Sequence, residues 1–352
     1  MMPVQMAESL SQDIYDIING TEKNNSSTEC PYFPDLNFVY TFVPPYIFTI
    51  CVTGLLGNMF VLLVFFLQKG RCTVAEIYLG NLAAADLMLL AGLPFWAVNI
   101  MHHFNWPFGD FLCRTTNVTI IFNMYTSIYL LAMVSIDRYL ALVRTMTTGR
   151  MRSVFYAKVF CLCIWLFGFI MSIPSVIYRS IEYVPEFDGV MCLLKFPEKS
   201  WTLASYIILN IIGFLLPVSI IAFCNYHIIK ALRESQKHAS SEDRSDNKAN
   251  KLIFAVILAF LLCWTPFHFF TFLEILYQVD CLKGCTWETI LELGNQIATY
   301  MACLNSLLNP VLYVFASQYF RRKITDIFKH TKPWRGSDLV ALQRSVIATH
   351  RQ

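Results

Sequence analysis

The sequence predicts an all-α membrane protein: a bundle of seven membrane-spanning helices followed by a short amphipathic eighth helix. Composition is the first reason, because 56% of the 352 residues are hydrophobic and only 14% are charged, whereas a soluble domain usually has about 25% charged residues. The second reason is that seven apolar runs are each long enough to cross a hydrocarbon core about 30 Å thick. These runs lie at about 42–67, 75–101, 111–136, 155–178, 202–229, 252–277 and 287–315.

A polar and acidic tail at residues 1–40 precedes the predicted bundle at 41–316. The tail lacks the basic start and apolar run of a cleavable signal peptide, so we expect the first span to act as the insertion signal. Three Asn-x-Ser/Thr sequons predict that the tail is glycosylated and extracellular. They begin at Asn19, Asn24 and Asn25.

Residues 317–330 are predicted to form the amphipathic helix. Phe320, Ile324 and Phe328 recur at four-residue spacing beside basic residues, which is typical of a helix lying on a membrane surface. Residues 331–352 are expected to form a cytoplasmic tail, either plainly solvated or phosphorylated. Its candidate phosphorylation sites are Ser337, Ser345 and Thr349.

Basic residues set the predicted orientation. If the first tail is outside, only six of the 27 Lys and Arg residues lie on its side of the membrane. That asymmetry predicts an extracellular N-terminus and a cytoplasmic C-terminus in a multi-pass plasma-membrane protein. The same assignment puts 15 of the 24 Asp and Glu residues outside, so we expect an acidic mouth that attracts cationic ligands.

The third run has a cysteine at one end and an Asp-Arg-Tyr sequence at the other. It begins at Cys113 and ends at Asp137, Arg138 and Tyr139, and a helix from Cys113 to Asp137 would span about 36 Å. The thiol would then lie in one aqueous interface and the Asp-Arg pair in the other, where Arg138 can reach water or a partner protein. The alternative is that these are ordinary charges that end a span.

An acid, Asp86, lies well inside the second run. Ionisable residues within membrane helices are functional by default, so we expect Asp86 to form a site for a small cation with polar side chains of the third and seventh runs. Structural polar contacts between helices are the alternative. Pro217, Pro266 and Pro310 remove helix hydrogen bonds and are candidate hinges. The expected partners of Asp86 are Asn123, Ser127, Asn305, Ser306 and Asn309.

The cysteines suggest external disulfides. Cys113 lies at the outer end of the third run and Cys192 in the loop between the fourth and fifth runs, so their pairing would pin that loop over the bundle. Cys30 in the tail can pair with Cys281 or with Cys285. Connectivity cannot be deduced from the sequence alone.

The motifs together resemble those of rhodopsin-like G-protein-coupled receptors over about residues 40–330. They occur in the family's order: GN at 57–58, LAAAD at 82–86, DRY at 137–139, Trp165, FLLP at 214–217, CWTPF at 263–267 and NPVLY at 309–313. The resemblance implies that Asp137, Arg138 and Tyr139 face a G protein and that Asp246 helps hold Arg138 at rest. It also adds Tyr313 to the residues of activation. Asn225 departs from the pattern, because this class usually has tyrosine there.

More narrowly, the chain is similar to bradykinin receptors, nearest to the constitutive subtype that binds intact bradykinin. The similar stretches include FNWPFG, DRYLALVRTMTTGRMR and HFFTFLE. This resemblance implies the disulfides Cys113–Cys192 and Cys30–Cys285, with Cys281 as an extra cysteine. It implies a ligand site at Asn117, Ile121, Trp264, Phe267, Glu274, Glu292 and Gln296, with Ile121 where the des-Arg-peptide subtype has lysine.

Glu274 and Glu292 are expected to determine which ligand binds. Glu274 lies about two turns beyond Pro266 and Glu292 near the outer end of the seventh run, so both can face one extracellular cavity. Kinin receptors have acids at both places, and their peptides have an arginine at each end. Guanidinium–carboxylate contacts are charge-assisted and often bidentate. The alternative is that both acids are solvated at helix ends.

The implied mechanism starts with a peptide agonist that enters from outside. Spans five to seven would rearrange around Trp264 and Pro266 and open an inner cleft for a G protein. The Gq class is favoured, with phospholipase C and calcium release as the output. Arrestin and a receptor kinase are further expected partners beside the lipid bilayer, and we expect no cofactor, no nucleic acid and no enzymatic activity.

Other classes fit less well. A retinal pigment needs a lysine in the seventh run, and residues 286–315 contain none. The chain shows no inverted repeat of a transporter and no nucleophile–base set of an enzyme. The runner-up is a receptor for another small peptide or a chemokine, since angiotensin and chemokine receptors are near relatives. Chemokine receptors usually have a cysteine before the leucine of the LNP motif, where this chain has NSLLNP.

Overall fold

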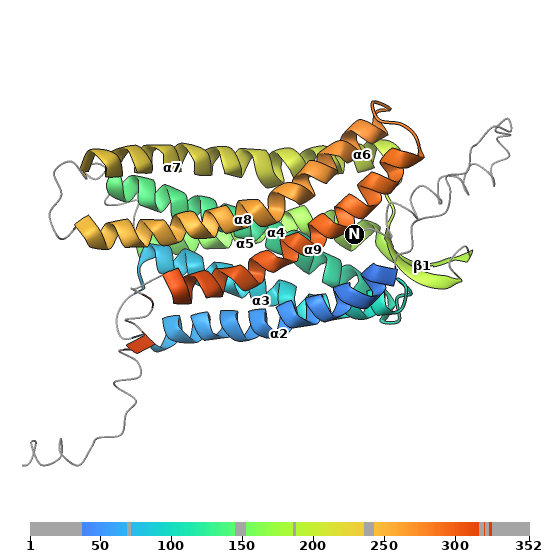
Figure 1. Ribbon diagram of the computed structural model, residues 1–352, viewed down its shortest axis with the longest axis horizontal. Helices are drawn as coiled ribbons and strands as arrows, with labels where there is room; N and C mark the ends of the chain where they lie inside the picture. The colour runs from blue at the N-terminus through green and yellow to red at the C-terminus, as the bar shows by residue number, and fades with distance from the viewer. Residues whose placement is uncertain are drawn as a thin grey trace, which may run out of the picture.

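The computed structural model describes residues 37–68, 72–144, 153–185, 188–235, 243–316, 320 and 324–325. The helices run side by side in alternating directions along one long axis (Figure 1). They are α2 (Asn37–Leu67), α3 (Val74–Met101), α4 (Gly109–Leu142), α5 (Val154–Tyr178), α6 (Lys199–Asn210), the π-helix η2 (Ile211–Leu215), α7 (Leu216–Ser235), α8 (Asp243–Gln278) and α9 (Cys285–Ala316). The three sequons and the tail at 331–352 lie outside the described residues.

Each predicted span corresponds to a helix. Among the described residues, six helices are long and apolar enough to cross a membrane, with α6, η2 and α7 forming one of them. The 32 residues of α9 supply the seventh helix of the bundle. The predicted all-α membrane bundle is confirmed.

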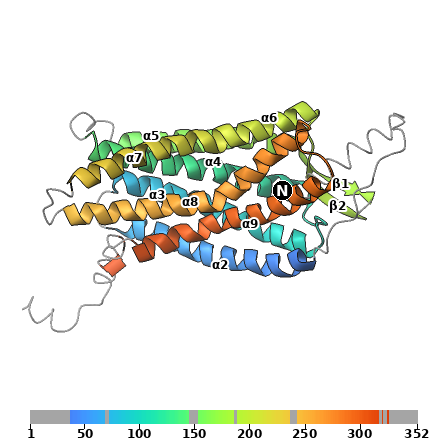
Figure 2. The ribbon, with the colours of Figure 1, turned by 45° about the horizontal axis from the view of Figure 1, so that its top comes forward.

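A two-stranded antiparallel sheet lies at one end of the bundle (Figure 2). Its strands are β1 (Arg179–Val184) and β2 (Gly189–Leu194), between α5 and α6. We call β1 and β2 the hairpin, and this end of the bundle the hairpin end. The N-terminus of α4 and the C-terminus of α8 lie there, whereas α8 begins at the opposite end (Figure 1).

The central helix is α4, which contains the third apolar run. In its most apolar window 67% of the residues are buried, against 22% in α5 and 33% in α2. Two contacts then fix α2 against α9. Asn58 Nδ2 donates to the Ser306 carbonyl over 2.8 Å, and a Cβ on Gly57 would lie 2.8 Å from Pro310 Cγ. Only glycine permits so close an approach of these helices.

Local sequence explains where several elements begin or change. Thr73 and Glu76 form a capping box at the start of α3, and the Ser153 side chain accepts from the Tyr156 N–H at the start of α5. The π-helix immediately precedes Pro217. A proline clashes with the carbonyl four residues earlier, and a wider turn relieves that clash.

The predicted amphipathic helix is described at three residues. Phe320 is buried, and its ring lies 5.9 Å from that of Phe65 and 6.3 Å from that of Phe60, both in α2. Ile324 packs against the same core. The segment therefore contacts the bundle at the end opposite the hairpin.

Candidate functional site

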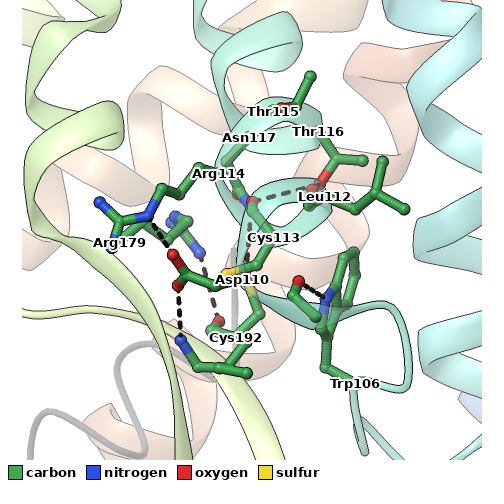
Figure 3. Close-up of a disulfide and its surroundings, with 12 residues drawn as sticks. Trp106, Asp110, Leu112, Cys113, Arg114, Thr115, Thr116, Asn117, Arg179 and Cys192 are labelled. Atoms are coloured by element: carbon green, nitrogen blue, oxygen red, sulfur yellow. Dashed lines mark hydrogen bonds and ion pairs between the residues drawn. A yellow bond between two sulfur atoms is a disulfide. The ribbon is translucent and has the colours of Figure 1, made fainter.

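A disulfide between Cys113 and Cys192 joins α4 to β2 (Figure 3), as predicted. Asn117, one turn further along α4, donates to the Cys113 carbonyl over 2.7 Å and lies 3.5 Å from Cys192 Sγ. Asn117 was expected to bind ligand, and here its amide supports the disulfide. Cys285 is also disulfide-bonded, whereas Cys281 is a free, exposed thiol; Cys30 lies outside the described residues, so its pairing stays a prediction.

Two small apolar cavities lie below the hairpin end. The outer cavity contains the predicted residue Gln296, and the inner one contains Ile121, Trp264 and Phe267. Ile120, Thr299 and Cys303 line both, so the two adjoin. The remaining side chains of the outer cavity, which sequence reasoning missed, are Ile47, Leu93, Trp96, Ile100, Phe104 and Tyr300.

The acids predicted to bind ligand, Glu274 of α8 and Glu292 of α9, are both buried, with exposed fractions of 6% and 8%. They are therefore not solvated side chains at helix ends. Within the described part of the chain, Glu292 has no ion pair with a basic side chain. The helices that carry the acids pack closely, since a Cβ on Gly294 of α9 would overlap the Phe270 ring of α8.

Asp86 is fully buried at the centre of the bundle. Its Oδ1 accepts from Asn123 Nδ2 over 3.0 Å and from Ser306 Oγ over 2.8 Å, and its Oδ2 accepts from Asn309 Nδ2 over 2.9 Å. The predicted partners Ser127 and Asn305 are buried nearby on the same helices but do not bond Asp86. Within the described residues, Ser127 Oγ and Asn305 Oδ1 have no hydrogen-bond partner.

The Asp-Arg-Tyr motif lies at the end opposite the hairpin. Arg138 Nε is 3.9 Å from Asp137 Oδ2, and Asp137 is buried. Asp246 and Tyr313 lie on α8 and α9, but their side chains are outside the described residues. The structure therefore leaves their expected roles as predictions.

Tyr139 packs against α7 beside these charges. Its ring lies 5.8 Å from that of Phe223 and 5.9 Å from that of His227. Tyr226, which adjoins the atypical Asn225, is 67% exposed. Tyr226 therefore does not take the inward position usually held by tyrosine, and the α7 rings that contact Tyr139 are those of Phe223 and His227.

The family model for 7 transmembrane receptors (rhodopsin family) matches residues 57–313. The chain belongs to this family. The receptor is 45% identical over 311 residues to the B1 bradykinin receptor of Homo sapiens, covering 88% of each chain. It is 42% identical over 331 residues to the B2 bradykinin receptor of Homo sapiens, covering 93% of this chain and 85% of the other. The B1 bradykinin receptor of Tupaia minor is 44% identical over 313 residues, covering 88% of this chain and 89% of its own.

The predicted similarity to bradykinin receptors is confirmed, and the receptor is a multi-pass protein of the plasma membrane. Its identities to the two subtypes are nearly equal, so the expected nearness to one of them stays a prediction. In the receptor, the aromatic ring of Trp264 lies between those of Phe260 and Phe267, with centroids 5.9 and 5.8 Å away. Trp264 thus joins the floor of the inner cavity to the core below it.

Proposed function

We propose that the receptor binds a bradykinin-type peptide at the hairpin end and activates a G protein of the Gq class at the opposite end, with phospholipase C activation and calcium release as the output. The observation that carries this proposal is the burial of Glu274 and Glu292 in the two helices that approach each other beside the cavities. Glu292 has no ion pair with a basic side chain among the described residues, and a buried carboxylate in that position is costly without a cationic partner. A ligand with guanidinium groups offsets that cost through charge-assisted hydrogen bonds.

The proposed orientation places the hairpin end outside the cell. Disulfides persist in oxidising compartments, and both the Cys113–Cys192 bridge and the disulfide-bonded Cys285 lie at this end. The ion pair of Asp137 and Arg138 then lies at the cytoplasmic side, where the G protein binds. Arrestin and a receptor kinase would bind there after activation, at the tail that contains Ser337.

The hydrogen-bonded cluster at Asp86 is proposed to hold a sodium ion in the resting receptor. Hard cations prefer oxygen ligands, and the cluster offers the Asp86 carboxylate together with side-chain oxygens of Asn123, Ser127, Asn305 and Asn309, which have no hydrogen-bond donor among the described residues. A ligand that favours the active arrangement and an ion that favours the resting one oppose each other. Sodium should therefore weaken agonist binding.

Charge-removing substitutions test the ligand assignment. Glu274→Gln and Glu292→Gln keep shape and hydrogen bonding but remove the charge. Loss of one partner of a desolvated ion pair costs roughly 2–5 kcal/mol, so the Kd of an intact kinin should rise by about 30-fold or more in each variant. A kinin analogue that lacks the corresponding arginine should lose much less affinity.

Asp280→Asn is the matched control, because Asp280 is an acid in the loop between α8 and α9 whose side chain is 75% exposed and 3.7 Å from Lys283. An exposed pair contributes at most about 1 kcal/mol, so this variant should bind as the wild type does. Wild-type kinin affinity in the Glu274→Gln, Glu292→Gln double variant would refute the assignment. Radioligand binding on membranes measures all of these.

A further inference from the structure

The hairpin presents two unpaired edges. In a two-stranded antiparallel sheet, each strand pairs with its partner on one side only. Ile181 lies opposite Cys192 and Tyr183 lies opposite Val190. These two pairs are two residues apart along the hairpin, so their outward backbone groups alternate with the groups that join the strands. The N–H groups of Ile181 and Val190 point away from the partner strand, because each donates to a side chain outside the sheet.

The edge of β1 is bound by α4. Asp110 Oδ1 accepts from the Ile181 N–H over 3.3 Å, while Asp110 Oδ2 accepts from Arg114 Nε over 2.6 Å. Arg114 Nη1 donates in turn to the Val176 carbonyl over 2.5 Å, in the last turn of α5 where helix carbonyls lack intrahelical donors. Asp110 and Arg114, both labelled in Figure 3, therefore join α4, α5 and β1.

The edge of β2 is bound by the loop before α4. The Trp106 N–H donates to the Val190 carbonyl over 2.6 Å, and Asn105 Oδ1 accepts from the Val190 N–H over 3.0 Å. Trp106 is itself fixed, because it is 2% exposed and its indole donates to the Gly109 carbonyl over 2.9 Å. Both edges are thus held by one short segment of the chain.

We propose that residues 105–114 form a non-covalent cradle that positions the hairpin over the bundle without the help of the disulfide. The Cys113–Cys192 bridge ties the hairpin at one point of β2 and makes no contact with the outward backbone groups of Ile181 or Val190. The cradle holds opposite edges through Asp110 and Asn105 and so fixes the orientation. Asp110 and Asn105 are positioning residues: they act on a ligand only through the hairpin.

Amide hydrogen exchange on the purified full-length receptor tests each edge. Asp110→Ala should speed exchange of the Ile181 amide by about tenfold, the ratio that one hydrogen bond typically supports, and leave Val190 protected. Asn105→Ala should do the reverse. Asp188→Asn is the control, because the Asp188 side chain accepts from the Tyr183 hydroxyl and, among the described residues, bonds neither amide; neither amide should change. Equal exchange at both amides in wild type and variants would overturn the cradle.

Removing the bridge provides the decisive comparison. In Cys113→Ser, Cys192→Ser, both amides should exchange within about tenfold of the wild-type rate, and adding Asp110→Ala and Asn105→Ala should speed each amide by about a further tenfold, since each then loses its own acceptor. Full loss of protection on removal of the bridge alone would refute the proposal. If the protein without the bridge does not fold, Asp110→Ala and Asn105→Ala still test the proposal, because both variants retain the disulfide.

Ligand dissociation gives a second readout, which rests on the proposed function. A bradykinin-type peptide should leave the Asn105→Ala, Asp110→Ala variant about tenfold faster than the wild type, because the hairpin over its site moves more. An unchanged dissociation rate beside faster amide exchange would refute the effect on the ligand. Failure of the peptide to bind even the wild type would refute the proposed function and leave the exchange result standing.

Discussion

Asp86→Asn isolates the charge of the central cluster from its hydrogen bonds. Asp86 Oδ1 accepts from Asn123 and Ser306, and Oδ2 accepts only from Asn309. An asparagine can place its oxygen at the first position and its NH2 group opposite Asn309. Asn309 Oδ1 has no hydrogen-bond partner in the described residues, so a flip of that amide turns an acceptor toward the new donor.

All three hydrogen bonds can therefore survive the substitution, and we expect the free energy of unfolding to fall by less than about 1 kcal/mol. The loss that remains is the carboxylate charge at a site with 0% exposure. Coupling between two ligands of one receptor is typically worth 1–3 kcal/mol, or about 5- to 150-fold in affinity. Replacing sodium by a large organic cation should raise wild-type agonist affinity by at least about fivefold.

The assay is agonist competition binding at constant ionic strength in sodium or N-methylglucamine chloride, with the melting temperature as a second readout. Sodium should raise the melting temperature of the wild type by mass action. In Asp86→Asn, sodium should change neither the melting temperature nor the agonist affinity. Glu76→Gln is the control, since Glu76 is a buried acid of the same helix whose side chain accepts from the backbone N–H of the N-cap residue Thr73, away from the cluster. Sodium dependence that persists in Asp86→Asn would show that the acid is only a packing contact.

Three further outcomes are expected. Peptide mapping without reduction should recover a crosslink between Cys30 and Cys285, and a crosslink of Cys285 to the neighbouring free cysteine would contradict it. Truncation after Thr331 should slow agonist-driven internalisation, which equal rates for both forms would disprove. Gly57→Ala should lower the melting temperature because its Cβ would meet a proline ring of α9 at 2.8 Å. Gly80→Ala, with its nearest contact at 3.5 Å, should not, and equal shifts would exclude this packing argument.

The bundle can be predicted well from the sequence, because the length of each apolar run and the positions of its polar residues are properties of that run alone. The helices coincide with the predicted runs and extend beyond several of them, as α4 does to Gly109 and Leu142. Membrane thickness explains the extension: helices continue past the hydrocarbon boundary until the chain turns. The Asp86 cluster can also be predicted from the sequence, since it needs only an acid and several amides on facing helices.

Features that depend on contacts between elements are harder to predict. Ser306 bonds Asp86 and Asn305 does not, although the two residues are consecutive, because adjacent helix positions differ by about 100° in direction. Pro217 indicates a local disturbance, but the π-helix also depends on its neighbours: Tyr129 donates to the Ile212 carbonyl over 2.9 Å. The hairpin is not predictable from its own residues, because the contacts at its edges come from α4 and the loop before it, far away in the chain.

The occupied edges of the hairpin restrict how a peptide can be recognised. Many domains bind an extended peptide by adding it as a further strand, so that affinity comes from main-chain hydrogen bonds and tolerates many sequences. Here Asp110 occupies the Ile181 amide, and Trp106 and Asn105 occupy both backbone groups of Val190. A peptide cannot add as a further strand at Ile181 or at Val190, so recognition of a peptide ligand at these positions would rest on its side chains and termini.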